Sequence, residues 1–129
     1  MADTVRDFDI RAPRDVLYRA HGDGGEVTCR MDWNRTFPRE MRQRFGKAQK
    51  YVDQECIRRM ERDTPFRSGV LRRSAAMGTV IGSGRIRQST PYARRQYYEH
   101  KEKSRWFERM KNRDKDVIME GAMRVAARD

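Results

Sequence analysis

Asp63-Thr64-Pro65-Phe66-Arg67-Ser68-Gly69-Val70-Leu71-Arg72-Arg73-Ser74 opens the segment around which the chain is organised. Pro65 ends a long helical pattern, because its ring and missing N–H do not fit inside a helix and the residue before it is pushed toward extended geometry. Thr90-Pro91 starts helical structure again, with Thr90 as the expected N-cap and Pro91 at the first helical position. The segment therefore predicts a connection between two helices.

Residues 75–88 predict a β-hairpin inside this connection. Residues 75–81 alternate, Gly82-Ser83-Gly84 supplies the turn, and Arg85 to Gln88 return with Ile86 on the opposite face from Arg85 and Arg87. The small residues of the first strand suit close approach by another backbone, either in a sheet or across a subunit contact.

Upstream, residues 34–63 predict the main helix. Its apolar residues recur at spacings of three and four, and they are Phe37, Met41, Phe45, Ala48, Val52, Cys56 and Met60. Thr36 is the expected N-cap, and Pro38 falls in the first turn. We expect this stripe to pack on a sheet, with a coiled-coil partner as the alternative. Gly46 allows a close helix contact.

Glu26 to Trp33 predicts a half-buried strand, because Val27, Cys29, Met31 and Trp33 alternate with polar residues. Residues 1–25 are interrupted by Pro13 and by a glycine-rich run, and both an arm that orders on a partner and a packed strand fit them. We therefore predict an N-terminal arm or extension over 1–25 and a single domain over 26–129.

The C-terminal third predicts a short helix over 91–100 and a final helical stretch over 105–127. The charged run 111–116 fits either a solvated turn of one helix or a break between two. The predicted fold class is α+β: a long amphipathic helix packed on a small antiparallel β-sheet with a hairpin, plus a C-terminal helix.

The composition is strongly basic and poor in apolar residues. The 129 residues are 36% hydrophobic and 38% charged, with a net charge of +11, so we expect a thin core helped by neighbouring molecules. Residues 65–129 hold most of the excess positive charge, which suits a phosphate backbone or an acidic protein surface. No apolar stretch approaches the ~20 residues that span a bilayer, and the start of the chain is not a secretory signal, so we expect no membrane partner and a reducing, soluble compartment.

Catalytic and metal-binding patterns are weak. Cys29, Cys56, His21 and His100 match no zinc spacing, and both cysteines are expected to be buried small hydrophobes. Gly78-x3-Gly82-x-Gly84 lacks the lysine and the strand-to-helix position of a phosphate loop. Asp53, Glu55 and Glu61 are spaced for a charged helix face and not for an acid/base pair. We expect no cofactor and no enzyme activity.

Four pieces of the sequence carry a resemblance to a known family. They are Thr64-Pro65-x-x-Ser68-Gly69-x-Leu71-Arg72-x-Ser74, the glycine-rich segment after it, and Pro91-Tyr92-Ala93-Arg94-Arg95-Gln96-Tyr97-Tyr98, followed by Trp106 to Met110. Together they resemble the tailed-phage minor capsid family of head-tail connector (neck or tail-completion) proteins, over about residues 27–126. The resemblance implies a bacteriophage virion protein that forms a ring of six or twelve copies around the DNA channel at the head-tail junction. It also implies synthesis in the host bacterial cytoplasm, with connector, stopper and tail-terminator proteins as partners and packaged DNA nearby.

Two sets of residues follow as site hypotheses. We expect subunit or ring contacts at Met77, Val80, Ile81, Ile86, Tyr92, Tyr97, Tyr98 and Trp106. We expect some arginines to face DNA or another anionic surface, and the candidates are Arg72, Arg73, Arg85, Arg87, Arg94 and Arg95. For each arginine, a solvated charge or an intrachain salt bridge is the alternative.

Two other functions remain open at this point. The first is a basic nucleic-acid-binding regulatory protein. The second is a ribonuclease or toxin-like enzyme, because Arg95-x4-His100 resembles the short Arg/His signature of some helical ribonucleases.

Overall fold

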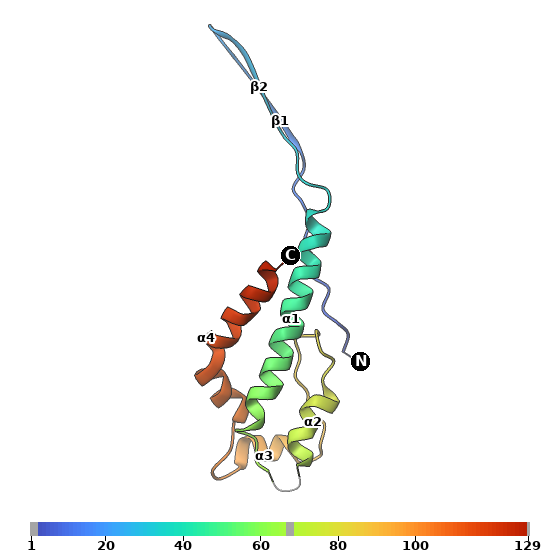
Figure 1. Ribbon diagram of the computed structural model, residues 1–129, viewed down its shortest axis with the longest axis vertical. Helices are drawn as coiled ribbons and strands as arrows, with labels where there is room; N and C mark the ends of the chain where they lie inside the picture. Colours follow the sequence, from blue (N-terminus) through green and yellow to red (C-terminus); the bar gives the residue numbers. More distant parts are fainter. Residues whose placement is uncertain (1–2, 67–68, 129) are drawn as a thin grey trace.

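The computed structural model describes residues 3–66 and 69–128, and within them it contains four helices and one two-stranded antiparallel sheet (Figure 1). The predicted α+β class, with a long helix, a small antiparallel sheet and a C-terminal helix, is confirmed. In chain order the elements are β1 (Val16–Gly22), β2 (Gly25–Met31), α1 (Phe37–Glu61), α2 (Val70–Gly78), α3 (Ala93–Glu99) and α4 (Trp106–Ala127).

We call residues 36–129, which contain the four helices, the body. Helices α1 and α4 lie side by side within it (Figure 1). α1 follows Thr36 and has Pro38 in its first turn, as predicted, although the Thr36 hydroxyl contacts Asn34 and Glu40 and does not cap a backbone N–H. α4 runs unbroken through residues 111–116, so the charged run is part of one helix.

The close helix contact lies at Gly121 of α4 and not at Gly46 of α1. A Cβ added at Gly121 would overlap the ring of Tyr51 on α1, whereas nothing lies within 4 Å of the corresponding position at Gly46. The absence of a side chain at Gly121 therefore lets α4 approach α1 closely.

The core is small, as the composition predicts, and lies where all four helices meet. Its buried members come from the end of α1, from α2, from the start of α3 and from α4: Met60, Leu71, Ala75, Ala93, Trp106, Met110 and Ile118. Phe107, Ile57 and Cys56 pack against its edge while staying partly exposed.

The hairpin predicted over 75–88 is wrong. Residues 75–78 complete α2, and residues 79–90 form an irregular loop. Leu71 and Ala75 lie one turn apart and are both buried, so the small residues serve a helix face and not a strand. The two arms of the loop still meet, because the Arg87 N–H donates to Thr79 Oγ1 at 3.0 Å.

The antiparallel pair of strands lies nearer the N-terminus. β1 and β2 pair in register from Val16 opposite Met31 to Gly22 opposite Gly25, with Asp23 and Gly24 between them. The predicted domain boundary after residue 25 therefore falls inside this hairpin. Residues 3–15 contain no regular element but contact the body, where the Arg6 N–H donates to Gly82 O at 2.9 Å and the Phe8 ring lies 5.8 Å from that of Phe45.

Residues 32–36 join the sheet to the start of α1, the sheet projects away from that end, and α1 packs beside α4 (Figure 1). The expectation of a half-buried strand is wrong: every residue of β2 is exposed, and so is Cys29, which we expected to be buried. The alternation of β2 marks an apolar face that nothing in the described chain covers.

Candidate assembly surfaces

The motif that carries the family resemblance builds the framework of the body. Thr64 is fully buried, its hydroxyl donates to Met60 O at 2.8 Å, and its own carbonyl accepts from Arg72 Nε at 3.0 Å. The Ser74 hydroxyl donates to Leu71 O at 2.6 Å. Gly69 has φ +81°, a left-handed conformation that starts α2 and favours glycine. Arg67 and Ser68 of the motif lie outside the described residues.

Gln88 links this framework to the last helix. Its Nε2 donates to Leu71 O at 3.0 Å, and its Oε1 accepts from Trp106 Nε1 at 2.9 Å. The Trp106 ring packs edge-on against Tyr97, with 4.8 Å between ring centroids. Trp106 is only 1% exposed, which corrects its assignment as a subunit contact: it is a core residue.

Asp53 fastens the loop after α2 to α1. Its buried carboxylate accepts from the N–H groups of Gly82 at 2.8 Å and Gly84 at 3.0 Å, and from Gln49 Nε2 at 2.9 Å. The interpretation of Asp53 as part of a charged helix face is therefore wrong. Nothing in the helical spacing signals this role, because Gly82 and Gly84 lie 29 and 31 residues away in the sequence.

Four of the six candidate arginines have partners within the chain. Arg87 Nε lies 2.6 Å from the Asp3 carboxylate, and Arg85 lies 3.9 Å from it. Arg95 pairs with Glu99 at 3.1 Å, and Arg72 lies over the Phe66 ring besides its bond to Thr64 O.

The other two candidates, Arg73 and Arg94, are exposed. Neither has a side-chain partner within 3–66 and 69–128. Among the six candidates, these two are therefore the arginines with no competing hydrogen bond or ion pair in the described residues.

Four of the eight predicted contact residues are exposed. Met77 is 84% exposed, and Val80, Tyr92 and Tyr98 are exposed as well. Ile81, Ile86 and Tyr97 are half-buried. The structure does not gather these side chains into one patch, because Ile86 and Tyr97 pack against the core while Met77 points to solvent.

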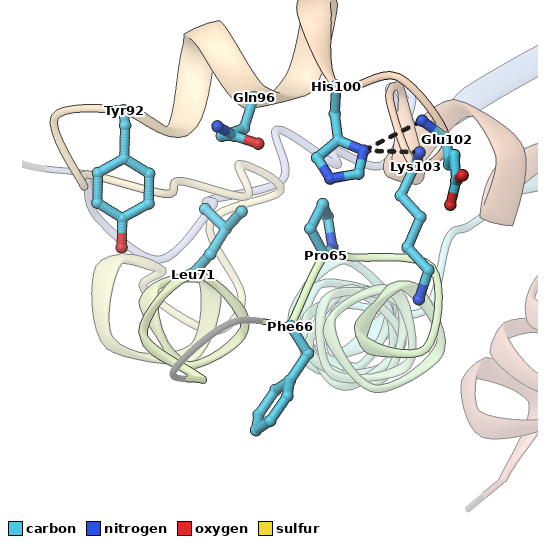
Figure 2. Close-up of a pocket in the computed structure, with 8 residues that line it drawn as sticks. All are labelled: Pro65, Phe66, Leu71, Tyr92, Gln96, His100, Glu102 and Lys103. Atoms are coloured by element: carbon cyan, nitrogen blue, oxygen red, sulfur yellow. Dashed lines mark hydrogen bonds between the residues drawn. The ribbon is translucent and has the colours of Figure 1, made fainter.

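A cleft of about 870 Å³ lies between the end of α1 and the two short helices. Figure 2 shows Tyr92, Gln96 and His100 on one side of it, opposite Leu71 and Pro65. His100 Nδ1 accepts from the N–H groups of Lys103 at 2.9 Å and Glu102 at 3.3 Å, so the imidazole holds the turn after α3. Arg95 pairs with Glu99 and does not line the cleft, so the structure does not assemble these two residues into one site.

Burial changes the chemistry of one cysteine. The pKa of the Cys56 thiol rises from 9.0 to about 11, because burial disfavours the thiolate and the nearby carboxylates of Asp53 and Glu55 add to the effect. Cys56 is a half-buried packing residue, so the expectation of burial is met only in part, and its raised pKa makes its thiol less easily deprotonated than that of a free cysteine.

No group of three or more His, Cys, Asp or Glu residues in the described ranges is placed to hold a metal ion. Among the same residues, none of the helices has the length and apolar character needed to cross a bilayer.

The surface that sequence reasoning missed is one face of the β1–β2 hairpin. Residues directly opposite each other share a face, so Val16 with Met31, Tyr18 with Cys29 and Ala20 with Val27 form one continuous apolar face. We call residues 16–31 the arm and these six side chains its apolar face. The other face carries Arg19, His21, Glu26 and Thr28 beside Leu17 and Arg30. Apolar and polar residues alternate on both sides of the Gly22-Asp23-Gly24-Gly25 turn, and this pattern could have predicted the hairpin from the sequence.

Comparison of the chain with protein-family models, with curated proteins and with solved structures finds no match.

Proposed function

We propose that this chain is a structural virion protein of a long-tailed bacteriophage. In this proposal, copies of the chain form a ring in the head-tail connector, as a neck or tail-completion protein around the DNA channel. The family resemblance of the sequence supplies the position in the virion. The shape of the molecule supports an assembly role.

The observation that carries the proposal is the uncovered apolar face of the arm. Tyr18 is 62% exposed and Val27 is 68% exposed, on a two-stranded hairpin that projects away from the helical body (Figure 1). An isolated two-stranded hairpin is marginally stable in water, so a partner that covers this face would stabilise it. Exposed apolar surface of this kind is typical of protein–protein contact sites.

The contacts of the motif residues also favour an assembly role. The polar side chains of Thr64, Arg72 and Ser74 make bonds within the chain, so they stabilise the fold. Candidate DNA-facing arginines Arg85 and Arg87 are paired with Asp3. These contacts favour a scaffold that presents surfaces for assembly over a surface built to track phosphates.

Loss of the gene in the phage that encodes this chain tests the proposal. We expect heads and tails that fail to join, together with loss of infectious particles, and we expect the chain supplied from a plasmid to restore both. Normal joined particles without the chain would contradict the proposal. Steeply salt-dependent binding of the purified chain to free duplex would then favour the regulatory alternative.

A further inference from the structure

The arm and the body differ sharply in charge. Residues 36–129 contain 24 Lys and Arg against 12 Asp and Glu, a net charge of +12, whereas the arm contains two arginines, Asp23 and Glu26, a net charge of zero. Two bodies therefore repel each other, because each carries a large charge of the same sign. The neutral arm can approach a second body without this repulsion.

The body offers a matching apolar surface on the outer side of α4. Met119 and Met123 lie one helical turn apart and therefore share a face, and they are 47% and 69% exposed. Ile118, Gly121 and Ala122 of the same helix are buried against the rest of the body, so the two methionines face outward. Flexible thioether side chains adapt well to an apolar partner.

The position of these methionines suits contact between neighbours that stand side by side. The C-terminal end of α4 lies beside the start of α1, which is the end of the body that carries the arm (Figure 1). Each strand of the arm has seven residues and so spans about 23 Å at the usual rise per residue. This reach is about twice the diameter of a helix with its side chains.

We infer that the apolar face of the arm docks on the Met119–Met123 side of α4 in a second copy of this chain. The inference rests on the proposed function in one respect, namely that copies of the chain come together. It adds the contact that joins them. The apolar face of the arm carries no positively charged side chain that could pair with phosphate groups. A nucleic acid is therefore not the partner that covers this face.

Sedimentation velocity of the full chain over a concentration series gives the first test. Val27 and Thr28 are neighbours on opposite faces of β2, so Val27→Asp and Thr28→Asp introduce the same charge on the apolar and the polar face. We expect Val27→Asp to weaken self-association at least tenfold and Thr28→Asp to change it less than twofold. Both positions are exposed, so at a concentration where the wild type is monomeric the thermal unfolding temperature of both variants should match that of the wild type.

Disulfide mapping identifies the surface that the arm contacts. In a Cys56→Ala background, Met123→Cys should give, on mild oxidation, a disulfide between Cys29 of one copy and the new thiol of another. Val70→Cys on α2 is the control, because Val70 is exposed but lies on another helix, and it should not cross-link to Cys29. The products are identified by mass spectrometry of the linked peptides.

Three results would overturn the inference. They are a wild-type chain that stays monomeric at every concentration, equal effects of Val27→Asp and Thr28→Asp, and a Cys29–Cys29 disulfide as the main product, which would mean that arms pair with arms. The proposed function is tested separately, by the joining of heads and tails. Conversely, a confirmed arm contact in a chain that the virion does not need would remove the proposed function and leave the inference standing.

Discussion

At the residue scale, Asp53 fastens the loop after α2 to α1. Its carboxylate accepts from two backbone N–H groups, of Gly82 and Gly84, that have no other bond partner among the described contacts. Asp53→Asn removes the negative charge and places an NH2 donor either against the N–H groups of Gly82 and Gly84 or against Gln49 Nε2. We expect it to lower the free energy of unfolding by about 1.5–3 kcal/mol, the usual value of hydrogen bonds to charged groups.

Urea unfolding followed by circular dichroism measures this effect. Asp116→Asn is the matched control, because Asp116 is exposed on α4 and we expect a change of about 0.5 kcal/mol or less there. Equal stability of the two variants would show that the Asp53 contacts do not hold the loop.

Cys56 gives a second prediction at this scale, on the dependence of its reactivity on pH. A rise of its pKa from 9.0 to about 11 lowers the thiolate fraction at pH 8 by about a hundredfold. In the Cys29→Ser variant, where Cys56 is the single thiol, we expect alkylation by iodoacetamide to be slower in the native state than in denaturing urea by at least that factor. Because the unfolded thiol ionises first as pH rises, this group also lowers the stability of the fold between about pH 9 and 11. Similar native and denatured alkylation rates would contradict the assigned burial.

At the element scale, two glycines in the paired helices α1 and α4 should respond in opposite ways to the same substitution. Gly46→Ala adds a methyl group where there is open space, so we expect α1 to gain about 1 kcal/mol of stability from the better helix propensity of alanine. Gly121→Ala places a methyl group into the ring of Tyr51, so we expect a loss of about 1–3 kcal/mol. Thermal unfolding of the two variants measures both signs, and stabilisation by Gly121→Ala would mean that α1 and α4 do not pack this closely.

The same scale shows what the sequence can and cannot predict. The long helix and the C-terminal helix follow from their apolar periodicity, and they are confirmed within a few residues. The segment 75–81 misled because a run of small residues fits both a strand and a helix, and only the contact of Leu71 and Ala75 with the core decides between them. Among the candidate contact residues, the exposure of Met77 could be predicted from the sequence. The burial of Trp106 could not, because it depends on contacts with Gln88 and Tyr97 that no local sequence pattern reveals.

At the scale of the whole molecule, the separation of a neutral arm from a basic body makes a prediction about salt. Salt screens the repulsion between bodies and leaves apolar contacts in place, so self-association should strengthen severalfold between low and high salt. A complex held by phosphate contacts weakens steeply over the same range. Sedimentation velocity at a series of NaCl concentrations measures the trend, and self-association that weakens with salt would contradict an apolar contact between copies.

Cryo-electron microscopy of intact virions, with the neck reconstructed under rotational symmetry, is the measurement that bears most directly on the proposal of a connector ring. We predict density for this chain in a ring between capsid and tail, with the arm of each copy lying against α4 of its neighbour. A neck that is fully accounted for by other proteins, with no density for this chain, would contradict the account.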